Sequence, residues 1–246
     1  MLGAFAVGAI TYVGGRYGWS NVALAFEVLF AFFITSVGFS SIGRERKQLL
    51  VDIPKGGPRN AWQVAANGGI ATLCAALAAV LARGGPPSHA AVALLWAFTG
   101  AYAAATADTW STEIGSAFGG KPRSIVGLAP IATGLSGGVS LVGSIAMVAG
   151  AAWIALVFAL ALKSAQAFWI VALGGVAGSL VDSLAGATLQ RIEFCPTCAR
   201  LTETAVHVCG TPTTRRHGLS WMTNDTVNAL ATLTGGLISA GLFLAG

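Results

Sequence analysis

Long runs of apolar residues, almost free of charge, recur along the whole chain and constrain its fold more than any other feature. A transmembrane helix needs about 20 such residues, because the hydrocarbon core of a bilayer is about 30 Å thick. Six runs are long enough: 21–42, 61–82, 90–118, 136–162, 166–190 and 224–244. A shorter run, 2–14, precedes them. The sequence therefore predicts an all-α, polytopic transmembrane helical bundle of about seven helices, six long and one short.

Composition supports the membrane class and argues against a separate soluble domain. Hydrophobic residues make up 55% of the chain and charged residues only 9%, far from the composition of soluble proteins. We therefore expect a single integral membrane domain over residues 1–246. The net charge of +5 could suggest nucleic acid as a partner. The basic residues, however, lie in short connections between apolar runs, where they act as topology signals, so we expect no nucleic-acid binding.

The distribution of Lys and Arg predicts which side of the membrane each connection faces. The second, fourth and sixth connections hold eleven of the fourteen basic residues, and cytoplasmic loops are the ones that carry such an excess. This bias places these connections, including the loop 191–222, in the cytoplasm. The N-terminus is also cytoplasmic if the run 2–14 spans the membrane. If that run lies at the membrane interface instead, only the predicted side of the N-terminus changes.

Two carboxylates lie near the predicted cytoplasmic end of the run 90–118. Asp108 shares a helix face with Ser111 and Thr112, and Glu113 follows about one turn later. An ionisable side chain costs about 2.5 to 3.5 kcal/mol at the centre of a transmembrane helix, so each one needs a reason. Carboxylate oxygens are ligands that Mg²⁺ takes alongside substrate phosphates. The alternative is that Asp108 only hydrogen-bonds neighbouring hydroxyls or an arginine.

The run 166–190 ends in a similar polar stripe, in which Asp182, Gly186 and Gln190 stack at i, i+4 and i+8. Asp182 is thus a third candidate ligand for Mg²⁺. Glycine in the stripe would let backbone or phosphate approach closely.

The last run opens with Asn224, Asp225 and Asn228. Helix capping by Thr223 or Asn224, together with the helix dipole, accounts for most of this group, including Asp225. Capping does not account for Asn228, one turn deeper on the Asn224 face. We therefore expect Asn224 and Asn228 to bind nucleotide or phosphate, with Asp225 as a further candidate ligand for Mg²⁺.

Hydrogen-bond donors enter the membrane along one face of the run 61–82 and the residues before it, at Arg59, Gln63 and Asn67. Donors in this arrangement suit an acidic group such as a phosphate. Lipid headgroups would satisfy Arg59 without any function, but they do not account for Asn67, two turns further in.

The fourth connection has the residue types that bind phosphate: two cations, Lys121 and Arg123, and glycine backbone N–H groups before a helix start. Alone this pattern is weak, because it contains no Walker-type Gly-Lys-Ser/Thr sequence. The candidate phosphate-binding residues beyond the two cations are Ser136, Gly137, Gly138 and Ser140.

The loop 191–222 contains Cys195 and Cys198 in a C-x2-C pattern, followed by His207 and Cys209. Thiolates and imidazole in this spacing could bind a structural Zn²⁺ tetrahedrally, although the second half-site is irregular. Cys74 lies inside an apolar run, where it is most simply a small core residue.

These polar clusters all fall on the predicted cytoplasmic side, whereas unrelated polar residues would scatter. Acids, phosphate-type donors and a deep apolar body together suggest metal-dependent phosphoryl or nucleotidyl transfer at the membrane surface. An ion-coupled transporter using Asp108 and Asp182 is an alternative from another class. Transporter sites usually lie near the bilayer midplane, however, whereas these acids lie near one face.

Five segments of the chain together resemble the integral membrane family that includes transmembrane protein 19 and the plant phytyl-phosphate kinase. They are 57–69, 107–115, 136–140, 182–190 and 224–228. The resemblance implies a kinase that uses CTP to convert a prenyl monophosphate, such as phytyl phosphate, to the diphosphate. The segment around Asp108 is also similar, more distantly, to the nucleotide region of polyprenol and phytol kinases.

The resemblance and the residue types together suggest roles. Asp108, Glu113 and Asp182 would hold Mg²⁺ and the triphosphate, with assistance from Asp225 or Asn228. Lys121, Arg123 and the glycine-rich turn would neutralise the transferred phosphate groups, and Arg59, Gln63 and Asn67 would bind the acceptor phosphate. A rival within the same class is cytidylyl transfer, which would release pyrophosphate and give a CDP-lipid.

Overall fold

The computed structural model describes residues 22–43, 61–82 and 87–246. Within these ranges six helices are long and apolar enough to cross a membrane, which confirms the predicted all-α, multi-spanning fold. The short run 2–14, predicted as a seventh helix, lies outside the described residues, as does Arg59. The helices are α2 (Val22–Ser41), α4 (Ala61–Leu81), α5 (His89–Phe118), α6 (Leu141–Leu162), α7 (Ala165–Thr188) and α8 (Asn224–Ala245).

Four of these helices begin at a hydroxyl side chain that accepts a hydrogen bond from a backbone N–H in the first turn, as N-caps do. The capping residues are Ser88, Ser140, Ser164 and Thr223. Two predicted boundaries were wrong. Because Ser140 caps α6, that helix begins at Leu141, and the residues 136–139 before it form a turn and a short strand. Helix α7 ends at Thr188, so Gln190 does not continue the helical stripe of Asp182.

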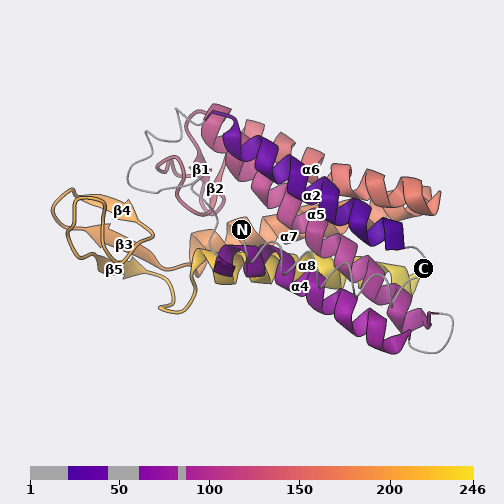
Figure 1. Cartoon of the computed structure of the whole chain (residues 1–246). Coiled ribbons are helices and arrows are strands. Elements are labelled where there is room, and N and C mark those ends of the chain that lie inside the picture. The colour runs from indigo at the N-terminus through magenta and orange to yellow at the C-terminus, as the bar shows by residue number, and fades with distance from the viewer. Residues whose placement is uncertain (1–21, 44–60, 83–86) are drawn as a thin grey trace.

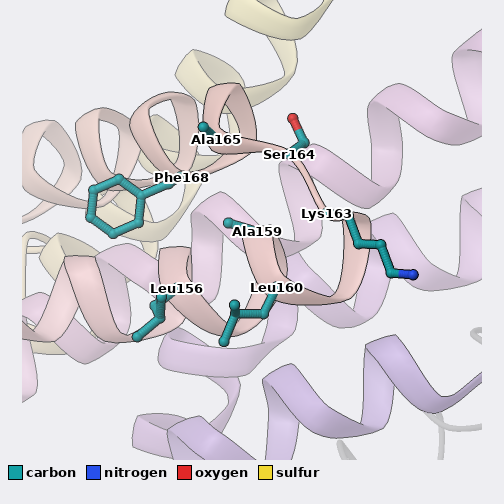
Figure 2. Close-up of a pocket in the computed structure, with 7 residues that line it drawn as sticks. All are labelled: Leu156, Ala159, Leu160, Lys163, Ser164, Ala165 and Phe168. Carbon is teal, nitrogen blue, oxygen red and sulfur yellow. The ribbon is translucent and has the colours of Figure 1, made fainter.

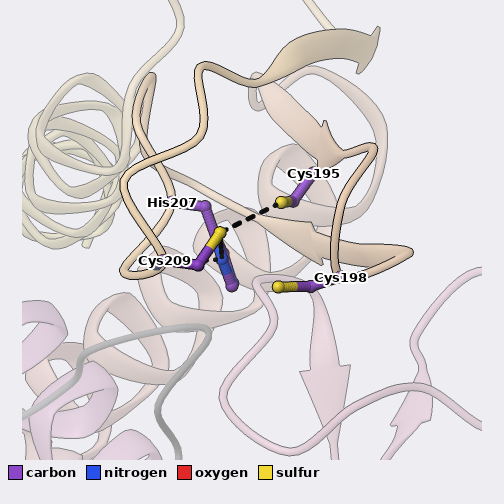
Figure 3. Close-up of side chains that lie close together, drawn as sticks. All are labelled: Cys195, Cys198, His207 and Cys209. Atoms are coloured by element: carbon purple, nitrogen blue, oxygen red, sulfur yellow. Dashed lines mark hydrogen bonds between the residues drawn. The ribbon is translucent and has the colours of Figure 1, made fainter.

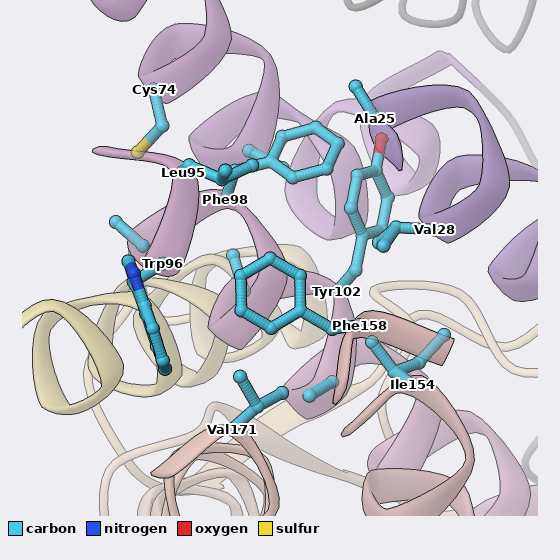
Figure 4. Packing of buried hydrophobic residues seen from close by; sticks show 14 of the residues in the cluster. Ala25, Val28, Cys74, Leu95, Trp96, Phe98, Tyr102, Ile154, Phe158 and Val171 are labelled. Atoms are coloured by element: carbon cyan, nitrogen blue, oxygen red, sulfur yellow. The ribbon is translucent and has the colours of Figure 1, made fainter. Parts of the chain in front are cut away.

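Helix α5 occupies the centre of the bundle and contacts each of the other five described helices. In the apolar stretch of α5, 83% of the residues are buried, whereas at most 44% are buried in the corresponding stretch of any other described helix. Figure 4 shows Phe98 and Tyr102 of α5 packed among side chains of α2, α6 and α7, including Phe158 of α6. The outer helices expose apolar side chains such as Leu160 and Trp169, as expected of surfaces that face lipid.

Small residues bring α5, α7 and α8 into close contact. A Cβ added at Gly178 of α7 would lie 2.6 Å from Ala104 Cβ and 2.6 Å from the carbonyl oxygen of Ala231. Gly235 of α8 likewise approaches the carbonyl oxygens of Gly100 and Gly174. Helices in lipid associate through such close packing, and these contacts set the relative height of the three helices.

Strands occur only in two connections of the described chain. In one, β1 (Arg123–Ser124) pairs with β2 (Gly138–Val139) between α5 and α6. In the other, β3 (Ile192–Cys195), β4 (Arg200–Thr202) and β5 (Thr214–His217) form an antiparallel sheet of order β4-β3-β5. We call the residues 191–222 the β3–β5 lobe. Sequence patterns predicted only a loop there.

Both strand-bearing connections lie at the same end of the bundle, where α5 and α7 end and α6 and α8 begin (Figure 1). We call this the lobe end. The β3–β5 lobe projects beyond the helices at this end. Helix α5 has 30 residues, which corresponds to a length of about 45 Å.

Candidate functional site

Three polar side chains, Asp108, Asp182 and Asn228, lie at one level near the lobe end of α5, α7 and α8. Their level follows from the contact at which Gly178 meets Ala104 and Ala231. Asp108 lies four residues after Ala104 in α5, and Asp182 lies four residues after Gly178 in α7, each on the same face of its helix. Asn228 lies three residues before Ala231 in the antiparallel α8. Helical register therefore brings residues from three separate sequence clusters together.

The environment of these side chains suits groups held away from bulk water. Asn228 is buried, and Asp182 is half-buried with its Oδ2 atom shielded from solvent. Asp108 is half-buried. Glu113, further along α5, is only 8% exposed. Carboxylates in such surroundings require a positive partner or hydrogen bonds, and their hard oxygens suit Mg²⁺.

Helix α4 brings a further buried amide to this end of the bundle. The Thr232 hydroxyl in the third turn of α8 donates a 3.2 Å hydrogen bond to the Ala66 carbonyl in the second turn of α4, which joins the two helices. The adjacent Asn67 is 7% exposed, and its Nδ2 donates to the carbonyl oxygen of Gln63 at 3.0 Å. Gln63, one turn nearer the lobe end, is half-buried. Gln63 and Asn67, the two described residues of the predicted donor stripe, thus lie at the same end of the bundle as the acids.

At the start of α8, Thr223 is the N-cap and accepts from the backbone N–H of Thr226, in agreement with one of the two capping alternatives. Asn224 and Asp225 occupy the first turn, and both are half-buried. A negative charge in a first turn is favoured by the helix dipole, so Asp225 needs no ligand to account for its position.

The connection between α5 and α6 packs its glycine turn onto α7, one turn beyond Asp182. Gly137 has φ +79°, and a Cβ there would lie 2.5 Å from Ala187. A Cβ at Gly186 would lie 2.9 Å from the backbone nitrogen of Gly137. Glycine at both positions lets the turn of Ser136 and Gly137 lie directly against the helix. The glycine cluster is thereby placed beside the acidic level.

The cations of this connection lie further out. Lys121 and Arg123 are exposed, and Arg123 Nη1 donates a 2.9 Å hydrogen bond to the Leu128 carbonyl. Gly138 pairs with Ser124 in the small β1–β2 sheet. Ser140 caps α6 and accepts from the N–H of Gly143 at 3.1 Å. Its hydroxyl therefore already has a structural role, in addition to the phosphate-binding role predicted for it.

Sequence reasoning assigned no role to Glu203, which connects the β3–β5 lobe to this turn. Its Oε1 accepts hydrogen bonds from the backbone N–H of Ser136 at 3.0 Å and from the Ser136 hydroxyl at 2.6 Å. Donors predicted to hold phosphate thus hold a carboxylate in this structure. In the sequence, the only indication of a role for Glu203 was that it is an acidic residue in a loop with several basic residues.

The sulfur and imidazole side chains of the lobe converge as their spacing suggested (Figure 3). The candidate ligand atoms of Cys195, Cys198, His207 and Cys209 all lie within 4.8 Å of one another. Side-chain hydrogen bonds with Thr211 and then His207 lower the pKa of the Cys209 thiol to about 6. Hydrogen bonding with Cys209 is the main cause that raises the pKa of Cys198 to about 11.

Two hollows in the helix surface lie away from these polar groups. One, of about 350 Å³, is formed where α6 turns into α7, about 33 Å along α6 from the lobe end (Figure 2). It is lined mainly by apolar side chains, including Leu156 and Phe168, together with Lys163. A second lies between α2 and α6 and includes Glu27, for which no role is evident. Neither hollow is lined by a group of carboxylates and amides like the one at the lobe end.

Comparison with known proteins matches residues 1–236 to the family described as "Integral membrane protein DUF92". The protein named "Protein PGR" from Arabidopsis thaliana is 32% identical over 214 residues, which cover 79% of this chain and 72% of that protein. An uncharacterised membrane protein of Methanocaldococcus jannaschii is 30% identical over 88% of this chain and 75% of its own length. Another, from Synechocystis, is 25% identical over 97% of this chain and 79% of its own length. No solved structure matches significantly.

Proposed function

This chain belongs to the integral membrane protein family DUF92, and from that premise we propose that it is a membrane-embedded, CTP-dependent kinase of prenyl monophosphates. The product would be the corresponding prenyl diphosphate. The observation that carries the proposal is the common level of Asp108, Asp182 and Asn228, directly beside the glycine turn of Ser136 and Gly137. Acidic ligands and phosphate-type donors are thereby combined at one end of an apolar bundle.

In this proposal Asp108, Asp182 and Glu113 would hold Mg²⁺ with the triphosphate, and Asp225 or Asn228 would assist. A bound Mg²⁺ neutralises charge on the transferred phosphoryl group and aligns it. In the glycine turn, Gly137 would donate its backbone N–H to the phosphates, because the N–H of Ser136 already donates to Glu203. Lys121 and Arg123 would supply positive charge from the same connection. Asn224 and Ser140 lie at the N-termini of α8 and α6, where helix dipoles favour anions.

The acceptor phosphate would be bound by Gln63 and Asn67 of α4, together with Arg59. One of its oxygens attacks the γ-phosphorus of CTP, forming the new P–O bond, while the bond to the β-phosphate oxygen breaks and CDP leaves. A phosphate monoester is already ionised near neutral pH, so the reaction needs positioning and charge neutralisation more than a strong general base. The isoprenoid chain would stay in the bilayer, and we propose that the lobe end faces the cytoplasm.

The decisive experiment incubates the purified protein with γ-labelled CTP and a panel of prenyl monophosphates of different chain length. Label in the lipid product supports the kinase. Label in pyrophosphate, with cytidine in the lipid, would establish cytidylyl transfer instead. Parallel reactions with γ-labelled ATP determine the nucleotide preference. Absence of any nucleotide turnover across the panel would contradict the enzyme proposal and favour a transporter.

A further inference from the structure

The β3–β5 lobe brings two tight turns together, and each turn carries a pair of potential metal ligands. The first joins β3 to β4 and contains Cys195 and Cys198, followed by Ala199 with φ +53°. The second contains His207 and Cys209, and the N–H of Gly210 donates to the His207 carbonyl at 2.8 Å. A hydrogen bond from the Thr211 hydroxyl to the Thr197 hydroxyl, 3.0 Å long, joins the two turns.

Two of the distances between the side chains are close to those around a tetrahedral ion. Cys195 Sγ lies 3.7 Å from Cys209 Sγ. Two thiolates bound at about 2.3 Å to one tetrahedral Zn²⁺ would be about 3.8 Å apart. His207 Nδ1 lies 3.1 Å from Cys209 Sγ, a few tenths of an ångström closer than in such a tetrahedron. Small rotations of these two side chains provide the difference.

A disulfide fits the arrangement less well. The two sulfurs of a disulfide lie about 2.05 Å apart, well below the observed separation of Cys195 and Cys209. A disulfide between two of the three cysteines would also not explain why the third cysteine and the buried His207 lie beside them. A zinc site explains all four side chains, because thiolate and imidazole are the ligands that structural zinc prefers.

The lobe also needs such a support. Its sheet has three strands of three or four residues, and its buried apolar side chains are few, including Ile192 and Met222. Sheets this small are marginally stable in water without a disulfide, a metal or packing against another element. Bound zinc contributes directly to the folding free energy of small domains.

We propose that Cys195, Cys198, His207 and Cys209 bind one structural Zn²⁺ ion that holds the β3–β5 lobe in its folded form. All four positions are filled by protein ligands, so the ion has no open site for substrate. Its effect on the membrane site passes through Glu203, which the folded lobe holds against Ser136.

The test measures metal content in the full-length protein, purified in detergent with a reductant and passed over a chelating resin. We expect roughly one zinc ion per chain by plasma mass spectrometry. The double variant C195S/C198S should retain less than about a tenth of that zinc, because it removes half of the ligands. Cys74→Ser, the same substitution at a buried cysteine of α4, should retain all of it. Equal zinc in the two variants would overturn the proposal.

A second measurement uses the unmodified chain, so it does not depend on whether a variant folds. Cobalt exchanged into the protein should show the absorption bands of tetrahedral Co²⁺ together with thiolate-to-metal charge transfer. Removal of the metal should let trypsin cut the lobe at Arg200, Arg215 and Arg216. Zinc-free protein with an intact lobe, or alkylation showing two of its cysteines joined as a disulfide, would refute the zinc site. Neither readout requires kinase activity.

Discussion

Glu203 Oε1 accepts hydrogen bonds from both the backbone N–H and the hydroxyl of Ser136, across 67 positions of the chain. The contact joins a projecting lobe to the glycine turn that lies against α7. Hydrogen bonds to a charged group are worth about 1.5 to 3 kcal/mol each when the alternative is an unsatisfied partner. Glu203 therefore acts as a positioning residue for that turn.

Replacing Glu203 with alanine should loosen the turn and lower the rate of phosphoryl transfer roughly tenfold, since one tenfold step corresponds to about 1.4 kcal/mol. Glu203→Gln keeps an oxygen acceptor and should lose much less. Hydrogen exchange at residues 134–140 should rise in the alanine variant and stay near the wild-type level in the glutamine variant. Unchanged exchange in Glu203→Ala would contradict the positioning role.

Asp108→Asn should reduce kcat/KM by about 100-fold or more, a loss of at least about 2.7 kcal/mol in transition-state stabilisation. The amide keeps the shape of the side chain and removes the charge that would hold Mg²⁺. Glu27→Gln is the matched control, because Glu27 is an exposed acid of α2 outside the polar level. Thermal unfolding of both variants should match the wild type. Retained activity in Asp108→Asn would refute the assignment of the metal ligands.

Asn67→Ala should raise the KM for the prenyl monophosphate by about tenfold while the KM for CTP stays unchanged. The reason is that Asn67 is proposed to contact only the acceptor. The variant also removes the hydrogen bond to the Gln63 carbonyl, which costs about 0.5 to 1.5 kcal/mol of stability. Steady-state kinetics with each substrate varied in turn separate the two effects. A rise in the KM for CTP alone would assign Asn67 to the nucleotide instead.

Gly178→Ala should destabilise the bundle by about 1 to 3 kcal/mol, because the new methyl group meets Ala104 and the Ala231 carbonyl at 2.6 Å. Gly69→Ala in α4 is the matched control, since a Cβ there meets nothing within 4 Å. That change should be neutral or stabilising, as alanine favours helix more than glycine does. Melting curves in detergent report both. Equal Tm values would show that the close contact does not set the packing.

Much of the fold could be predicted because the length of each apolar run by itself indicates a membrane-spanning helix. The helices α4, α5 and α8 begin and end within a residue or two of the predicted runs. The start of α6 was misplaced because the small residues from Ser136 to Val139 read as a continuation of the apolar run. In the structure, strand β2 and the capping hydrogen bond of Ser140 separate the turn from the helix.

The site could be predicted in part, for a similar reason. Spacing within one helix is visible in sequence, so Asp108 and Asp182 could be recognised as polar positions near helix ends. That they share a level with Asn228 depends on the glycine contacts between helices, which sequence periodicity does not specify. The contact between Glu203 and Ser136 joins two connections with no shared periodicity, so nothing in either segment indicates the other.

The length of α5 has a consequence for how a lipid substrate would reach the polar level. About 29 Å of helix separates His89 from Asp108, close to the thickness of the hydrocarbon layer, and the following residues extend about 15 Å further. With His89 at the opposite membrane surface, we expect Asp108 to lie at the depth of the phospholipid headgroups. A phosphorylated isoprenoid carries its own phosphate at that depth and would find the protein by lateral, two-dimensional diffusion. Its effective concentration is then its mole fraction in the bilayer, and diluting the vesicles should leave the rate per protein unchanged.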